Sequence, residues 1–290
     1  MTKDKVLLII MILLGMTLIP LGDTAGKLLM QAGVSPLFVA WSRLFMGFLV
    51  ILPLSGIKLS EVSLTFNWRL LLRAGLFLCA VTLILKAVET ESIANVFGAF
   101  FIGPIISYFL AALVLKEEIT LLRSTLLLIG FAGALMVIKP GFGMTQGMGL
   151  AALSGCFYGC FLVTNRWLAG SFRPRFILLT TLFSGSIVLA PLGIAAIPEF
   201  NLHISGLLLI SALASAFGNL IIIEANRKLP ASVVAPFVYT QLIAATFFSI
   251  VVFDSWPDIL SLIGLSILFI SGLASFILSN NKPISTVKET

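Results

Sequence analysis

Ten long apolar segments follow one another along this chain, and they constrain its fold more than any other feature of the sequence. A helix needs roughly 20 predominantly apolar residues to cross the hydrocarbon core of a bilayer. The segments lie near residues 6–30, 35–55, 71–88, 93–115, 121–138, 148–166, 175–196, 205–224, 231–253 and 259–279. The pattern therefore predicts an all-α integral membrane protein with ten transmembrane helices.

Charged residues make up only 10% of the 290 residues, whereas a soluble domain carries roughly 25%. So few charges cannot cover a surface exposed to water, and we expect the lipid bilayer to surround the protein. The net charge of +6 comes from scattered basic residues, so nucleic acid is not an expected partner. The cysteines Cys79, Cys156 and Cys160 lie in apolar segments and lack the spacing of a metal site or a disulfide framework. Neither a metal nor another cofactor is expected.

Lysine and arginine in short loops predict the orientation, because positive residues stay on the cytoplasmic side of a membrane. With the N-terminus inside, 14 basic residues lie at cytoplasmic ends: Lys3, Lys5, Lys58, Arg69, Arg73, Lys116, Arg123, Arg166, Arg173, Arg175, Arg227, Lys228, Lys282 and Lys288. Only three lie at the opposite ends: Lys27, Lys86 and Lys139. We therefore expect a multi-pass protein of a bacterial inner membrane with both termini in the cytoplasm.

The two halves of the chain carry weakly matching features in the same order. Lys27, Pro36 and Arg43 correspond to Arg166, Pro174 and Thr181; Lys86-Ala87 corresponds to Glu224-Ala225; the run 92–117 resembles 230–254. The sequence thus predicts a first repeat at 1–139, a linker at 140–147, and a second repeat at 148–290 with a short cytoplasmic tail. Five spans are an odd number, so the second repeat enters the membrane from the other side. Such inverted repeats are typical of secondary transporters.

Several ordered motifs resemble a known family. They are Pro36 to Arg43, Ser92-Ile-Ala-Asn-Val at the start of the fourth segment, Pro104 within it, and Leu115-Lys-Glu-Glu-Ile-Thr120 before the fifth. In these features the chain resembles the drug/metabolite transporter superfamily, EamA type, over nearly its whole length. The resemblance implies ten helices in two inverted five-helix repeats, around a central cavity lined mainly by the first, third, fourth, sixth, eighth and ninth. Asp254 stands where the family usually has Glu, and Gln241 stands where the first half has Pro104.

Four charged residues in or beside the spans are candidates for coupling or charge pairing. Arg43 either recognises a carboxylate or phosphate, or is a structural cation between helices, which we favour. Asp23 and Lys27 are four residues apart on one helix face, and we favour a mutual pair over a proton-coupling site. Glu224 is the best protonatable candidate.

Neutral polar and aromatic residues are the better candidates for a solute pocket, because such cavities are mostly apolar with a few hydrogen-bonding groups. The candidates for substrate binding are Asn95, Phe97, Phe100, Tyr108, Tyr158, Asn165, Asn219, Tyr239 and Gln241. The alternative for each polar residue is a hydrogen bond to a neighbouring helix.

The function that fits these expectations is secondary transport of a small amphipathic metabolite across the inner membrane by alternating access. The solute classes that we consider are an amino acid, an aromatic compound, a nucleoside-like and a flavin-like compound. No ATPase motif is present, so a solute gradient or a coupled ion, such as a proton, would drive transport. The expected assembly is a monomer or homodimer.

Two other functions compete with transport. A non-transporting membrane helper or lipid-binding protein is the main alternative. A membrane-embedded enzyme is less favoured, since the one histidine, His203, lies in an outside loop and no Gly-x-Ser-x-Gly motif is present.

Overall fold

The computed structural model describes residues 3–90, 96, 99–118, 120–138 and 145–279, and all regular structure in these residues is helical. Its α-helices are α1 (Lys3–Gln31), α2 (Pro36–Ser55), α3 (Trp68–Thr90), α5 (Gly103–Val114), α6 (Leu121–Ile138), α7 (Gln146–Leu168), α8 (Pro174–Ile194), α9 (Leu202–Lys228), α10 (Ala231–Val234), α11 (Gln241–Phe253) and α12 (Ile259–Ser279). Two short 3-10 helices accompany them, η1 (Leu59–Phe66) and η2 (Ala235–Thr240). The predicted all-α class is confirmed.

Seven described helical stretches are long and apolar enough to cross a membrane, and α5 and part of α12 add two shorter apolar ones. Large apolar side chains cover the outside of the bundle: Leu113 is 78% exposed, and Ile270 on α12 is 66% exposed. In water such a surface would drive aggregation, whereas in a bilayer it faces lipid. The protein is a multi-pass membrane protein.

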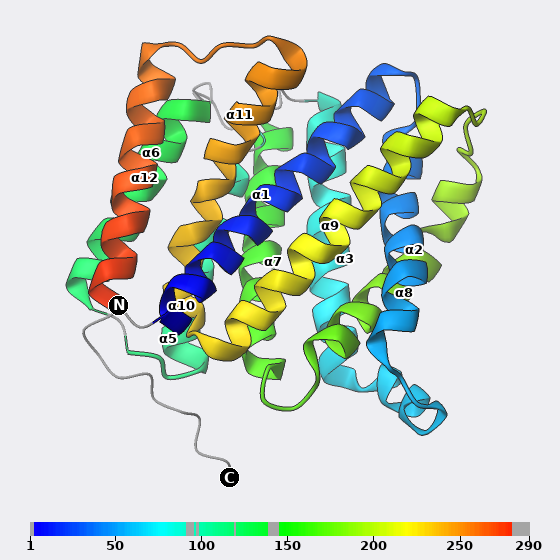
Figure 1. Ribbon diagram of the computed structural model, residues 1–290, viewed down its shortest axis with the longest axis horizontal. Helices are drawn as coiled ribbons and strands as arrows, with labels where there is room; N and C mark the ends of the chain where they lie inside the picture. Colours follow the sequence, from blue (N-terminus) through cyan, green and yellow to red (C-terminus); the bar gives the residue numbers. More distant parts are fainter. Residues whose placement is uncertain (1–2, 91–95, 97–98, 119, 139–144, 280–290) are drawn as a thin grey trace.

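The helices run between two opposite faces of the molecule (Figure 1). The start of α1, the end of α12 and the η1 connection lie at one face, which is the lower one in Figure 1. The α1–α2, α8–α9 and α11–α12 connections lie at the upper face. Successive helices therefore alternate in direction, as hydropathy and loop charge predicted.

The largest helix contacts join elements that are far apart in the chain. α1 packs against α9, α3 against α7, α2 against α8, and α6 against α12. Figure 1 shows α1 and α9 running side by side across the front of the bundle. Each of these four contacts joins the first half of the chain to the second, so neither half forms the core alone.

Small residues allow α5 and α7 to approach closely. A Cβ atom on Gly159 would lie 2.6 Å from the Gly103 carbonyl oxygen, and Gly155 packs against the Phe100 carbonyl. A Gly-x-x-x-Gly pattern is typical of close helix packing, and the pattern at 155–159 has that role here.

The sequence predicts that Pro20, Pro104 and Pro236 interrupt the first, fourth and ninth apolar segments. Two of these three breaks are present. Pro104 lies at the start of α5, and Pro236 lies at the start of η2, which separates α10 from α11. The third expectation is wrong, because α1 continues through Pro20. A membrane helix tolerates proline where neighbouring groups satisfy the freed carbonyl.

Candidate functional site

The site centres on Arg73, which is buried between α3, α7 and α8. Only 1% of this residue is exposed. Its Nε donates to Oδ1 of Asn165 at 2.8 Å, and its Nη1 donates to Oγ1 of Thr181 and lies 3.5 Å from the Ile177 carbonyl oxygen. The guanidinium also lies 4.4 Å above the ring centre of Phe161. All these partners are neutral.

A cavity opens beside this arginine, where five helices from both halves meet. The lining side chains come from α2, α3, α7, α8 and α9: Arg43, Leu44, Arg73, Phe77, Phe161, Leu178, Thr181, Leu182, Ser215, Ala216 and Asn219. Of the six segments that the family resemblance implied as lining a central cavity, only the third, sixth and eighth line this one among the described residues, and the second and seventh segments complete it. Its volume of about 20 Å³ is on the order of one water molecule. A molecule larger than water therefore does not fit in the cavity in this conformation.

The cavity lies deep in the bundle. Arg43 follows the start of α2 by seven residues, and Thr181 follows the start of α8 by seven. At 1.5 Å per residue each lies about 10 Å along its helix, and the two helices start at opposite faces (Figure 1). Helices of 20 and 21 residues are about 30 Å long, so the cavity occupies the middle of the bundle.

Arg43 is held by a carboxylate on α1. Its Nη1 lies 2.8 Å from Oδ1 of Asp23, with the two side chains 21% and 51% exposed. The expected Asp23–Lys27 pair is wrong, since the Lys27 ammonium instead lies 4.3 Å from the ring centre of Phe253. An exposed ion pair four residues apart on a helix contributes only about 0.3–0.5 kcal/mol to stability. Asp23 contributes more where it neutralises Arg43, which lies inside a span. The structural role that we favoured for Arg43 agrees with this geometry.

Two predicted polar residues take part in the site. Asn219 lines the cavity and donates from Nδ2 to the Ser215 carbonyl of its own helix at 2.9 Å. Asn165 is 1% exposed and holds Arg73. Three of the predicted residues therefore lie at or beside this cavity: Arg43, Asn165 and Asn219.

Three other predicted residues lie on or beside α7 and α11. The Tyr158 ring packs 4.9 Å from the Phe100 ring. Gln241 Nε2 lies 3.2 Å from Sδ of Met16. These side chains do not line the cavity beside Arg73.

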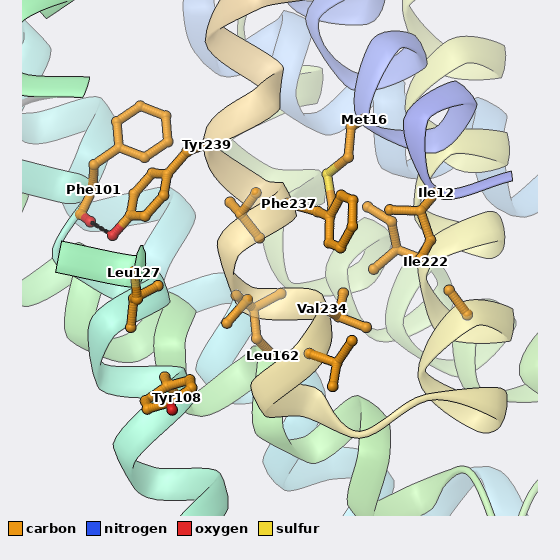
Figure 2. Close-up of a cluster of buried hydrophobic side chains, with 14 of the residues drawn as sticks. Ile12, Met16, Phe101, Tyr108, Leu127, Leu162, Ile222, Val234, Phe237 and Tyr239 are labelled. Carbon is orange, nitrogen blue, oxygen red and sulfur yellow. Dashed lines mark hydrogen bonds between the residues drawn. The ribbon is translucent and has the colours of Figure 1, made fainter. Parts of the chain in front are cut away.

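Tyr108 and Tyr239 lie in the main apolar cluster and not at the cavity. Tyr239 donates its hydroxyl to the Phe101 carbonyl oxygen at 3.2 Å (Figure 2). The Tyr108 hydroxyl lies 3.2 Å from Oγ of Ser124. Both rings are almost fully buried, so each has the partner that a buried phenol requires.

The remaining predictions concern Asn95, Phe97 and Glu224. Asn95 and Phe97 lie outside the described residues. Glu224 is half-buried on α9, and no hydrogen bond or ion pair joins it to another described residue. Within the described part of the chain, no group of three His, Cys, Asp or Glu residues is placed to hold a metal ion.

Sequence reasoning missed Arg73, because it was counted among the basic residues at cytoplasmic ends. Arg73 lies only five residues from the start of α3, but its side chain is turned into the bundle and buried. One signal was available: Arg73 shares a helix face with Leu70 and Phe77 at spacings of three and four residues. That spacing alone does not separate a face toward protein from a face toward lipid.

A polar contact joins several helix ends at the lower face. The Glu117 carboxylate accepts hydrogen bonds from the backbone N–H groups of Ala231 and Ser232 at 2.9 and 2.8 Å. The Arg166 Nε lies 3.7 Å from Glu117, and its Nη1 donates to the carbonyls of Asn226 and Arg227. The contact joins the first half of the chain to the second.

Comparisons with known proteins agree with the membrane architecture. The EamA-like transporter family matches this chain twice, at residues 6–139 and 145–277. A probable transport protein of Saccharomyces cerevisiae is 24% identical over 61% of this chain, and an uncharacterized transporter of Helicobacter pylori is 26% identical over 64%. These matches span 58% and 65% of the relatives' own lengths, so this chain covers less than two thirds of each.

A solved crystal structure has the same fold. It superposes with a TM-score of 0.78 over 97% of this chain and 99% of its own, at 14% sequence identity. At that identity the likeness concerns the fold alone.

Proposed function

Since this chain belongs to the EamA-like transporter family, we propose that it is a secondary transporter that moves a small amphipathic metabolite by alternating access. The observation that carries the proposal is the buried cavity, which lies in the middle of the bundle between helices from both halves. Its lining is apolar with a few polar groups, which is typical of a solute site.

The two halves are, in this proposal, inverted repeats. Three observations support it. The family model matches each half separately. The packing of α1 on α9 corresponds to that of α7 on α3, so the first helix of each half lies on the third helix of the other. Lys116 and Asp254, the two described non-glycine residues with positive φ, are 138 residues apart, as are Lys86 and Glu224.

Alternating access follows from repeats of this kind. Two inverted copies can exchange conformations, so that the cavity opens first to one side and then to the other. The contact of Glu117 with Arg166 and the start of α10 would hold the lower face closed in the present conformation. The small cavity volume fits an occluded intermediate of such a cycle.

We place the lower face in the cytoplasm of a bacterial cell, with the protein in the inner membrane and all ten segments crossing it. Arg166, Arg173, Arg227 and Lys228 lie at the helix ends of this face. Glu199 and Asp254 lie beside connections at the other face. The positive-inside rule supports this orientation.

Counterflow in proteoliposomes tests the proposal. A thermal-shift screen of the purified chain against amino acids, aromatic acids, nucleosides and flavins first selects a stabilising solute, because a ligand of the folded state raises stability by mass action. Vesicles are then loaded with unlabelled solute, and uptake of the labelled form is followed. A carrier accumulates label transiently above equilibrium, and protein-free vesicles do not. Absence of both stabilisation and counterflow would favour a non-transporting membrane helper or lipid-binding protein.

A further inference from the structure

Arg73 is a buried cation that lacks an anion. A charged side chain within a membrane span is costly, so such residues usually pair or face a polar cavity. Arg166 and Arg173 each have a glutamate partner, and Arg43 has Asp23. No described carboxylate lies within 4 Å of Arg73.

The hydrogen bonds of Arg73 use only part of the guanidinium. Nε and Nη1 donate to Asn165, Thr181 and Ile177. No hydrogen bond joins Nη2 to another described residue. The three acceptors hold the guanidinium plane in a fixed position beside the cavity, but they leave its charge uncompensated. A fixed fork of donors is the arrangement that binds carboxylates in proteins.

The charges around the cavity add up to one excess positive charge. Arg43 and Arg73 are its charged lining residues, and Asp23 neutralises Arg43. One remaining positive charge matches a monoanion, such as a carboxylate, and not a doubly charged phosphate monoester. The other lining groups include Leu44, Phe77 and Leu182, which favour a compact apolar body beside the anionic group.

We propose that Arg73 is the anion-binding residue of the transport site and that the solute is a monocarboxylate with a compact apolar body. The inference rests on the proposed function, and it narrows the solute to one chemical class. Thr181 and Asn165 orient the guanidinium, and Ser215 and Asn219 offer neutral hydrogen-bonding groups on the facing helix α9. The carboxylate enters when the helices separate and supplies the counter-charge that the closed protein lacks.

Matched acids and amides test the proposal on the purified full-length chain. The probes are 3-phenylpropionate with 3-phenylpropionamide, and 4-methylpentanoate with 4-methylpentanamide. Thermal unfolding is measured over a concentration series, which gives an apparent Kd for each probe. We expect each acid to bind at least about 10-fold more tightly than its amide, because both can accept a hydrogen bond from Arg73 but only the acid supplies a negative charge that pairs with the guanidinium.

Two variants test whether the preference for the acid over the amide depends on Arg73. Arg73→Gln should abolish the preference for the acid. Arg69→Gln is the matched control, since Arg69 lies one helical turn earlier on α3 and stacks on Trp68 and Trp167 outside the cavity. It should keep the preference of the wild type. If Arg73→Gln does not fold, Thr181→Val retains the arginine but removes one of its acceptors, and it should weaken acid binding about 3-fold or more.

The outcomes distinguish a failure of the monocarboxylate site from a failure of the proposed transport function. Equal binding of acid and amide, no binding of either acid, a preserved preference in Arg73→Gln, or tighter binding of phenyl phosphate would each overturn the monocarboxylate site. Counterflow of some other solute would leave the proposed transport function standing in that case. Loss of counterflow for every solute would instead reject transport itself.

Discussion

The Arg166 Nε lies 3.7 Å from the Glu117 carboxylate, and this ion pair joins the end of α7 to the segment that follows α5. Glu117 also accepts hydrogen bonds from the first two N–H groups of α10, while Arg166 donates to carbonyls at the end of α9. Four helix ends thus meet through two side chains. The contact satisfies backbone groups that helix ends leave free.

Glu117→Ala should lower the free energy of unfolding by about 1–3 kcal/mol, because it removes a charged hydrogen-bond acceptor from a mostly buried position. The thermal unfolding midpoint in detergent is the measurement. Glu199→Gln is the control, since Glu199 is an exposed glutamate in the connection between α8 and α9. Equal midpoints for Glu117→Ala and the wild type would show that the contact does not hold the helix ends together.

A double-mutant cycle of Asp23→Asn with Arg43→Gln should give a coupling energy of about 0.5–1 kcal/mol. The partial exposure of both side chains limits the value. The matching cycle of Asp23→Asn with Lys27→Gln should give a coupling near zero, because Lys27 packs on Phe253. Stronger coupling to Lys27 than to Arg43 would contradict this arrangement. Both cycles use denaturant-induced unfolding.

Two glycines of α7 should respond in opposite ways to alanine. Gly159→Ala should destabilise the protein by about 1–3 kcal/mol, because the new Cβ atom would press on the Gly103 carbonyl and push α5 from α7. Gly149→Ala meets no atom within 4 Å and should be neutral or stabilise the helix by up to about 1 kcal/mol. The thermal unfolding midpoints of the two variants test this prediction. A larger loss of stability in Gly149→Ala than in Gly159→Ala would refute it.

The stability contribution of Glu61 should depend on pH. The backbone N–H of Lys58 and the nearby Arg173 lower the pKa of Glu61 below 4.5, and Arg173 donates to both carboxylate oxygens at 2.9 and 2.7 Å. A lowered pKa stabilises the folded state at neutral pH, and this contribution is lost as the pH falls through 4.5 and below.

Unfolding midpoints of the wild type and Glu61→Gln, compared from pH 7 to pH 3.5, measure this effect. The wild type should be the more stable at pH 7, and the difference should shrink as the pH falls. Arg173→Gln should reduce the effect without abolishing it, because the Lys58 hydrogen bond remains. A difference that is constant over this range would contradict the prediction.

The amino-acid sequence by itself determined the membrane architecture. Apolar length specifies which segments are helices, because in lipid a backbone must satisfy its own hydrogen bonds. The positions of the spans, the breaks at Pro104 and Pro236, and the Gly-x-x-x-Gly packing on α7 all follow from local chemistry. The same residues carried the family resemblance, which the family match confirms.

Only the tertiary structure decided which polar side chains meet. Asp23 has Lys27 four residues away but pairs with Arg43, twenty residues distant. Arg73 looks like a topology signal in the sequence, yet contacts 92 and 108 residues away hold it inside the bundle. Hydropathy is uniform around a membrane helix, so it does not reveal which face meets protein and which meets lipid. The pairing of helices across the two halves determines which face of each helix meets protein. It also determines where the cavity lies.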